Sequence, residues 1–246
     1  MKTLIQEPIK KMSKIRLITF DLDDTFWDIK TTIVNAELNS RKWSEERIGE
    51  KIQWGTFEDF MKIRSLLVKE DPSLEYDLGM LRKKMIAHHT KKFFENAKDL
   101  NKFIEEAYNF FLEERHKVNF YDGVIEVLKE LSSKYKLGVL TNGNADVNKL
   151  KIGHLFDFSI SSIDVKSNKP NKNHFLKARE ISKINFENTL HVGDHQINDV
   201  LGARELGINT LWFNLNNVKW EADNNPPLQF NKWSQFEDLV EENYGS

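Results

Sequence analysis

Residues able to handle a phosphate or a metal ion recur along this 246-residue sequence, most of them directly after a short apolar run. Carboxylate oxygens suit Mg²⁺, a hydroxyl and backbone N–H groups suit phosphate oxygens, and a lysine adds a positive charge for phosphate. A carboxylate can also attack phosphorus and form an aspartyl-phosphate. These residue types predict phosphoryl transfer, in which catalysis is mostly positioning and charge neutralisation. The residues are Asp21, Asp23, Thr141, Asn142, Lys169, Asp194 and Asp199.

A parallel sheet would bring these scattered residues to one edge, because ligands of such sheets bind outside the carboxyl ends of the strands. Apolar runs predict strands buried on both faces, and helical patterns alternate with them, which predicts an α/β fold with a doubly wound, Rossmann-like parallel sheet. Strands are expected at about 15–21, 137–140, 189–192 and 210–213, with a weaker one near 156–165. Helices are expected at 122–134, around 145–152, at 171–183, at 199–206 and after a capping box at 234–237, with a loop at 215–229.

The span between the first strand and the rest of the sheet has a different pattern. Apolar residues fall at helical spacing, as in Phe57, Phe60 and Met61, and Asp99 is expected to cap one of about four helices. No convincing strand pattern interrupts them, so this span predicts an all-helical insert that caps the sheet. The predicted domains are a catalytic core at 1–27 and 116–246 and a helical cap at 28–115.

The composition excludes several kinds of protein. Hydrophobic residues make up 39% and charged residues 30%, and 36 basic against 38 acidic residues leave a net charge of -2, which gives no electrostatic footprint for nucleic acid or an anionic membrane. With no cysteine, disulfides, thiolate metal sites and thiol nucleophiles are excluded. No apolar run reaches the roughly 20 residues that span a bilayer, and residues 1–14 lack the apolar core of a signal peptide, so a cytoplasmic location is expected.

Four segments resemble, in order, the motifs of the haloacid dehalogenase-like hydrolase superfamily. They are Asp21-x-Asp23-x-Thr25, Thr141-Asn142, Lys169-Pro170, and Gly193-Asp194 followed by Asp199. The resemblance covers about 15–27 and 118–215, and an insert after the first motif matches the C1-capped branch. The stretches 18–25, 140–145 and 190–194 are most similar to bacterial members that dephosphorylate flavin mononucleotide and the ribitylamino-uracil phosphate of riboflavin synthesis.

The resemblance implies a role for each residue that would meet the substrate. Asp21 would be the nucleophile that attacks phosphorus. Asp23 would act first as general acid for the leaving alkoxide and then as general base for the water that hydrolyses the phospho-enzyme. Thr141 and Lys169 would bind the transferring phosphoryl group, and Asn142 would contribute its backbone N–H.

The resemblance also implies a Mg²⁺ cofactor. Asp194 would ligate the ion together with Asp21 and the backbone carbonyl of Asp23. Asp199 would orient Lys169 or support the ligands of the metal.

These roles predict a Mg²⁺-dependent phosphomonoesterase that acts on a small phosphorylated metabolite, with flavin mononucleotide and ribitylamino-uracil phosphate as the substrates to which the resemblance points. Asp23 disfavours a dehalogenase, since dehalogenases of this fold lack an acid at that position. Two alternatives stay open: a binding or regulatory protein that kept the fold and lost turnover, and a phosphomutase. Neither nucleic acid nor membrane is expected as a partner, and the oligomeric state is open between monomer and homodimer.

Other polar residues are expected to be structural. His191 and His195 lie on a predicted strand and the loop after it, with no cysteine or further histidine to complete a metal site. Arg64 and Arg82 lie on predicted cap helices, where either could meet the polar end of a substrate, and the role expected of each is that of a salt-bridge partner.

Overall fold

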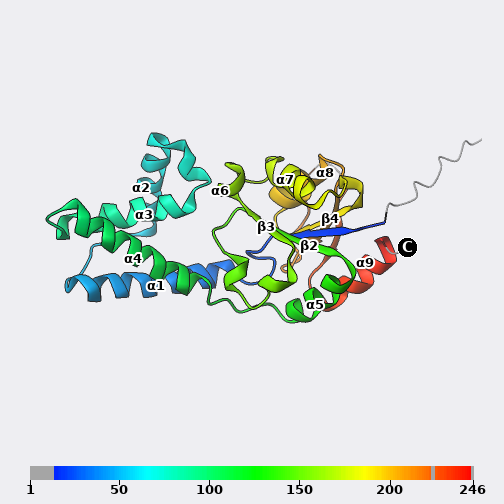
Figure 1. The fold of residues 1–246 in the computed structure, drawn as a ribbon, viewed down its shortest axis with the longest axis horizontal. Helices are drawn as coiled ribbons and strands as arrows, with labels where there is room; N and C mark the ends of the chain where they lie inside the picture. Colours follow the sequence, from blue (N-terminus) through cyan, green and yellow to red (C-terminus); the bar gives the residue numbers. More distant parts are fainter. Residues whose placement is uncertain (1–13, 223–224, 245–246) are drawn as a thin grey trace, which may run out of the picture.

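The computed structural model describes residues 14–222 and 225–244, and the predicted lead-in at 1–14 lies almost wholly outside this part (Figure 1). Six strands form one sheet in the order β3-β2-β1-β4-β5-β6, and every neighbouring pair is parallel. The chain places β2 and β3 on one side of β1 and β4 to β6 on the other, so the doubly wound sheet predicted from the sequence is confirmed. The strands are β1 (Leu17–Phe20), β2 (Lys136–Thr141), β3 (Phe158–Ser161), β4 (Thr189–Gly193), β5 (Asn209–Phe213) and β6 (Leu228–Phe230).

Helices cover both faces of the sheet (Figure 1). On one face, α5 and α9 bury their apolar residues in one large core, and on the other, α7 and α8 contribute to a second, smaller core. Each fully buried aliphatic side chain in these cores contributes about 1.5–3 kcal/mol through removal of apolar surface from water. The core helices are α5 (Val124–Lys134), α6 (Ser162–Val165), α7 (Asn173–Ser182), α8 (Gly202–Arg204) and α9 (Phe236–Tyr244).

A cluster of aromatic rings anchors the C-terminal part of the chain beneath β1. The Trp233 ring lies with its centroid 5.3–6.2 Å from those of several phenylalanines, and its Nε1 donates a hydrogen bond to the Thr25 carbonyl at 3.2 Å. Trp233 is buried. The rings that surround it are Phe20, Phe26, Phe213, Phe230 and Phe236.

Several predicted elements of the core are wrong in kind or in length. The helix expected around 145–152 is replaced by two short 3₁₀ turns, η3 (Val147–Lys149) and η4 (Gly153–Leu155). The Asp146 N–H donates to His116 Nε2 at 2.8 Å, and the Asp146 carboxylate accepts from the Asn148 N–H at 3.0 Å. A contact from a residue far away in the sequence therefore fixes the turn, which local spacing could not reveal.

The other differences concern where elements begin and end. The strand expected near 156–165 stops at Ser161, where a capping box with Asp164 starts α6. The helix expected from Asp199 begins three residues earlier, as a π-helical segment η6 (Gln196–Leu201), because His195 Nδ1 accepts from the N–H groups of the first turn. The predicted loop at 215–229 contains most of β6, and the final helix follows a 3₁₀ turn, η7 (Trp233–Gln235), rather than a capping box at 234–237.

The segment predicted to form the cap folds as four α-helices that lie to one side of the sheet (Figure 1). Within residues 28–115, all of which the structure describes, there is no strand. The insert has apolar clusters of its own, one around Phe103 and one around Leu81, and the division of the chain at 27/28 and 115/116 stays a prediction. The helices are α1 (Ile29–Ile48), α2 (Phe57–Glu70), α3 (Leu78–Thr90) and α4 (Ala97–Arg115), with 3₁₀ turns η1 (Pro72–Glu75) and η2 (Lys91–Phe93).

Local signals explain the ends of these helices. The Asp28 carboxylate accepts from the Lys30 N–H at 2.9 Å and begins α1, and Gly49 ends it with a φ of 83°, a conformation that favours glycine. The cap of α4 is Asn96, whose side chain accepts from the Asp99 N–H at 3.0 Å, so the prediction of Asp99 as the cap is wrong by three residues.

The two segments that connect the insert to the core lie side by side and are in contact. Trp27 on the outgoing connection forms a backbone bridge with Phe120 on the returning one, and the Tyr121 N–H donates to the Phe26 carbonyl at 2.8 Å. The Trp27 and Phe120 rings meet edge to face, with centroids 5.7 Å apart. The first motif is therefore held against the end of the insert.

We expect the substitution Trp233→Ala to lower the free energy of unfolding by about 3–5 kcal/mol, since it leaves a large cavity and an unsatisfied carbonyl beneath β1. Denaturant unfolding followed by circular dichroism would measure the change. As a matched control, Leu66→Ala on α2, where the side chain is 62% exposed, should change it by no more than about 0.5 kcal/mol. Equal effects of the two substitutions would contradict the importance of the aromatic cluster.

Candidate active site

The predicted site residues meet at the carboxyl ends of three adjacent strands. Asp21 directly follows β1, Thr141 ends β2, and Asp194 directly follows β4. Phe20 is in register with Val139 of β2 and Val192 of β4, so the three ends lie side by side. This is the point at which the strand order reverses, where ligands of such sheets bind.

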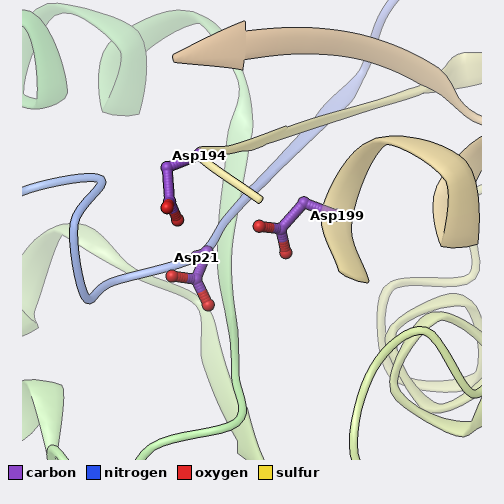
Figure 2. Close-up of side chains that lie close together, drawn as sticks. All are labelled: Asp21, Asp194 and Asp199. Atoms are coloured by element: carbon purple, nitrogen blue, oxygen red, sulfur yellow. The ribbon is translucent and has the colours of Figure 1, made fainter. Parts of the chain in front are cut away.

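Three carboxylates converge there (Figure 2). Asp21, Asp194 and Asp199 each offer an oxygen, and these oxygens all lie within 4.8 Å of one another. Hard oxygen donors at this spacing are the ligands that Mg²⁺ takes in proteins, so the donor set fits the predicted ion. The oxygens of the Asp199 carboxylate are engaged elsewhere, whereas the Asp194 carboxylate has no hydrogen bond or ion pair with the described residues. Asp21 and Asp194 are therefore the available ligands.

Lys169 lies at the centre of this acidic cluster, with 2% of its surface exposed. Its Nζ donates to Asp21 Oδ1 at 2.7 Å, to Asp199 Oδ1 at 2.6 Å and to the Leu140 carbonyl at 2.6 Å. All three ammonium hydrogens are thereby used. The lysine links the nucleophile candidate to the carboxylate that the sequence analysis expected to orient it.

The Asn142 side chain holds the backbone of Lys169 from both sides. Its Oδ1 accepts from the Lys169 N–H at 2.7 Å, and its Nδ2 donates to the Lys169 carbonyl at 3.0 Å. The sequence predicted a contribution of the Asn142 backbone to phosphate binding, which stays a prediction. The clamp on Lys169 is an additional role of the side chain that the motif alone did not indicate.

Asp199 is fixed by a chain of buried polar contacts. Its Oδ1 lies 3.3 Å from His191 Nε2, and its Oδ2 accepts from the His195 N–H at 3.0 Å. On the other side of the imidazole, His191 Nδ1 lies 2.9 Å from Thr19 Oγ1. A Cβ on Gly193 would collide with the Asp199 carboxylate, so the close approach of this side chain to β4 requires glycine.

The pKa values reflect an excess of buried negative charge. Burial raises the pKa of Asp194 to about 9, with Asp21 and Asp199 adding to the rise. Burial also raises the pKa of Asp21 to about 7, although Lys169 acts in the opposite direction. Burial alone would lower the pKa of Lys169, but Asp199 and Asp21 hold it above its ordinary value. For Asp199, Lys169 outweighs burial and lowers the pKa.

Three carboxylates thus face one ammonium. A divalent cation at this position would offset the remaining repulsion and favour the ionised forms of Asp21 and Asp194. The excess of negative charge and the carboxylate oxygens therefore both favour a divalent cation at this site.

Asp23 and the loop after β2 form the second part of the site. The Gly143 N–H donates to Thr141 Oγ1 at 2.9 Å. A Cβ on Gly143 would lie 2.5 Å from Asp23 Oδ2 and 3.3 Å from Thr141 Oγ1, so glycine is required here and the two side chains border the same space. The acid candidate therefore faces the hydroxyl expected to bind phosphate.

Sequence reasoning missed Arg115, the last residue of α4, although the structure places it against Asp23. Its Nη2 donates to Asp23 Oδ1 at 2.6 Å and to Oδ2 at 2.7 Å, and Trp27 Nε1 donates to Oδ1 at 2.9 Å. Arg115 follows Phe111 by four residues, on the buried face of an amphipathic helix. A charged residue at such a position was the available signal, since buried charges are normally paired.

A cavity of about 160 Å³ lies between the insert and Asn144, next to the loop after β2. Its wall is mostly apolar, with the arginines Arg64 and Arg82 added. Arg82 pairs with Glu37 at 2.5 Å and stacks over the Phe111 ring, as expected of a salt-bridge partner. The apolar residues of the wall are Ile33, Phe60, Leu78, Leu81, Met85 and Phe111.

A model of the haloacid dehalogenase-like hydrolase family matches residues 15–207. The chain belongs to this family. The match spans all four motifs, so the resemblance inferred from them is confirmed, and so is the prediction of a hydrolase.

Two curated relatives of this haloacid dehalogenase-like hydrolase are named as phosphatases. The 5-amino-6-(5-phospho-D-ribitylamino)uracil phosphatase YigB of Escherichia coli (strain K12) is 23% identical over 235 residues, which cover 94% of this chain and 98% of the relative. The glyceraldehyde 3-phosphate phosphatase of Pyrococcus abyssi is 29% identical over 221 residues, with 81% of each chain covered.

Among solved structures, a 2-haloacid dehalogenase from Pseudomonas syringae pv. Tomato DC3000 superposes with a TM-score of 0.86 at 33% identity, covering 93% of this chain and 99% of the other. The hydrolase YfnB of Bacillus subtilis, solved with bound magnesium, gives a TM-score of 0.63 at 21% identity and shows the same fold.

In the part of the chain that the structure describes, no helix is both long enough and apolar enough to cross a bilayer.

We expect Mg²⁺ to raise the melting temperature of the wild-type protein. At a free Mg²⁺ concentration a hundred times the Kd, binding should add about 2.7 kcal/mol to the free energy of unfolding. Because the ion must displace protons from Asp194, with a pKa of about 9, and from Asp21, with a pKa of about 7, binding tightens as pH rises. The shift should therefore be larger at pH 8 than at pH 6. Differential scanning fluorimetry with increasing Mg²⁺ would measure it.

The substitution Asp194→Asn should remove this shift, and Asp122→Asn, at an exposed acidic residue, should leave it intact. An undiminished shift in the Asp194→Asn variant would exclude Asp194 as a ligand.

Proposed function

We propose that this enzyme is a Mg²⁺-dependent phosphomonoesterase that works through an aspartyl-phosphate at Asp21. One observation carries the proposal: the Asp21 and Asp23 carboxylates lie at the same strand ends. Buried Lys169 binds the Asp21 carboxylate, and the Asp23 carboxylate faces the Thr141 hydroxyl. This supplies a nucleophile, a separate acid and a phosphate-binding hydroxyl in one place.

In the first half of the reaction, an Asp21 oxygen forms a bond to phosphorus as the bond between phosphorus and the leaving oxygen breaks. Asp23 gives its proton to that oxygen, so the alcohol leaves neutral. Thr141 donates a hydrogen bond to the phosphoryl oxygens, and Lys169 adds positive charge beside them. Mg²⁺, when bound by Asp21 and Asp194, supplies further neutralisation of the charge on the phosphoryl group.

In the second half, water attacks phosphorus and releases phosphate from Asp21. Asp23, now a carboxylate, takes the proton from the attacking water and is ready to act as acid again. One phosphate ester and one water become one alcohol and one phosphate, and both carboxylates return to their initial state. The Asn142 clamp and the Asp199 contacts keep Lys169 beside Asp21 throughout.

A dehalogenase is the second candidate, favoured by the name of the structure from Pseudomonas syringae. Asp23 is the residue that opposes it. A halide leaves without a proton, so dehalogenation has no use for an acid at this position, whereas an alkoxide leaving group requires one.

For the substrate, we propose a small phosphorylated metabolite. The two phosphatase relatives are named for leaving groups of very different size, a ribitylamino-uracil and a three-carbon aldehyde. The apolar cavity beside Asn144, with its arginines, is one place where the insert meets the loop after β2, and it is where a leaving group would lie. Flavin mononucleotide and ribitylamino-uracil phosphate remain proposals, as do a cytoplasmic location and a monomeric or homodimeric state.

The substitution Asp21→Asn should reduce hydrolysis of p-nitrophenyl phosphate by at least about a thousandfold, because an amide cannot form the aspartyl-phosphate. Release of p-nitrophenol in the presence of Mg²⁺ would measure it, with circular dichroism to show that the fold is kept. Asp157→Asn, at a carboxylate that accepts from the Leu137 N–H near the start of β2, is the matched control and should retain activity. Retention of most activity by Asp21→Asn would eliminate Asp21 as the nucleophile.

On a panel of phosphate esters and 2-haloacids, we expect release of inorganic phosphate, no release of halide, and loss of all turnover in excess chelator. Ranking by kcat/KM would identify the leaving group. Halide release would favour the dehalogenase, and a phosphorylated isomer in place of free phosphate would identify a phosphomutase. An inactive protein that still binds the esters would support the binding or regulatory alternative.

A further inference from the structure

Arg115 is buried at the end of α4 with most of its hydrogen-bonding capacity unused. Only 1% of its surface is exposed, and its Nε and Nη1 have no hydrogen-bond partner among the described residues. Its Nη2 contacts both oxygens of Asp23, and its guanidinium lies 5.9 Å from the centre of the Trp27 ring. In residues 14–222 and 225–244, its one ion-pair partner is Asp23, the acid candidate of the site.

This arrangement contributes poorly to stability. A buried guanidinium loses its hydration, and an ion pair recovers that loss only when the remaining donors are also satisfied. Two nitrogens of Arg115 find no acceptor in the described part of the chain, and Asp23 also receives a hydrogen bond from Trp27. The contact is therefore better explained by what it does to Asp23 than by stabilisation of the fold.

The contact also crosses from the insert to the core. Asp23 lies on the outgoing connection, and Arg115 is the last helical residue before the returning one. The two connections are joined by the backbone bridge between Trp27 and Phe120. The position of the Asp23 carboxylate thus depends on where α4 ends.

We propose that Arg115 is a positioning residue for Asp23: it holds the Asp23 carboxylate beside the Thr141 hydroxyl, where the leaving oxygen must be protonated. This inference rests on the proposed phosphatase reaction. When Asp23 gives its proton to the leaving oxygen, the negative charge that stays on Asp23 meets the Arg115 guanidinium. When Asp23 then takes a proton from the attacking water, that charge is neutralised, and no other side chain of the enzyme gains or loses a proton.

The effect of Arg115 should depend on the leaving group. In kcat/KM, which reports on steps up to the first phosphoryl transfer, protonation matters for an alkyl phosphate such as glycerol phosphate. It does not matter for 2,4-dinitrophenyl phosphate, whose phenolate leaves without a proton. We expect Arg115→Met to lower kcat/KM at least about tenfold for the alkyl ester, within the range that general acid catalysis supplies, and less than about threefold for the aryl ester.

Two further variants separate this role from a structural one. Arg115→Lys restores a cation and should recover part of the alkyl phosphate activity. Arg47→Met removes another arginine paired with α4, through Glu106 at 3.3 Å, and should change neither substrate. Melting temperatures would show which variants are folded. If Arg115→Met is not folded, Arg115→Gln replaces it in these measurements.

A double-mutant cycle tests whether Arg115 acts through Asp23. Asp23→Asn alone should lower alkyl phosphate kcat/KM about a hundredfold or more, and adding Arg115→Met should cause little further loss, because the group that Arg115 positions is already gone. Equal losses for both esters in a folded Arg115→Met variant, or additive losses in the double variant, would overturn the inference. If Asp23→Asn itself kept full alkyl phosphate activity, the proposed function would be wrong at Asp23, whatever Arg115 does.

Discussion

The ammonium of Lys169 is the contact on which the site depends. It is buried between Asp21, which directly follows β1, and Asp199 in η6, the segment after β4, and it uses its third hydrogen on the carbonyl of Leu140 in β2. Two buried carboxylates at this spacing would repel each other without a cation between them. The lysine therefore joins three neighbouring strand ends electrostatically, and its own position is fixed by the Asn142 clamp.

The sheet was predictable because its central strands are buried on both faces. β1, β2, β4 and β5 carry mostly apolar residues that are nearly all buried, and such runs need no knowledge of distant contacts to be recognised. β6 was missed because it is three residues long, two of them exposed, and it exists only because β5 provides a partner. The helix expected around 145–152 failed for a similar reason, since a contact with His116 determines that turn.

The same distinction applies to the candidate site. Asp21, Thr141, Lys169 and Asp194 follow strands or motifs that are visible in the sequence, and the fold brings them together, although their individual roles remain proposals. Arg115 lies 92 positions from the residue it contacts, in a segment with no motif. Only the way in which the insert returns to the sheet places it there. The sequence thus indicates which residues the core contributes, and the structure is needed to show what the insert adds to them.

The positions of β6 and Trp233 in the sequence determine when this domain can complete its core during synthesis. Trp233 donates to the Thr25 carbonyl, so a residue synthesised 208 positions after Thr25 supports the loop that carries the first aspartates. Domains fold as units while they leave the ribosome, but this one lacks part of its core until β6 and α9 have emerged. A nascent chain stalled before β6 would carry every catalytic candidate and still lack the Phe230, Trp233 and Phe236 rings of the aromatic cluster.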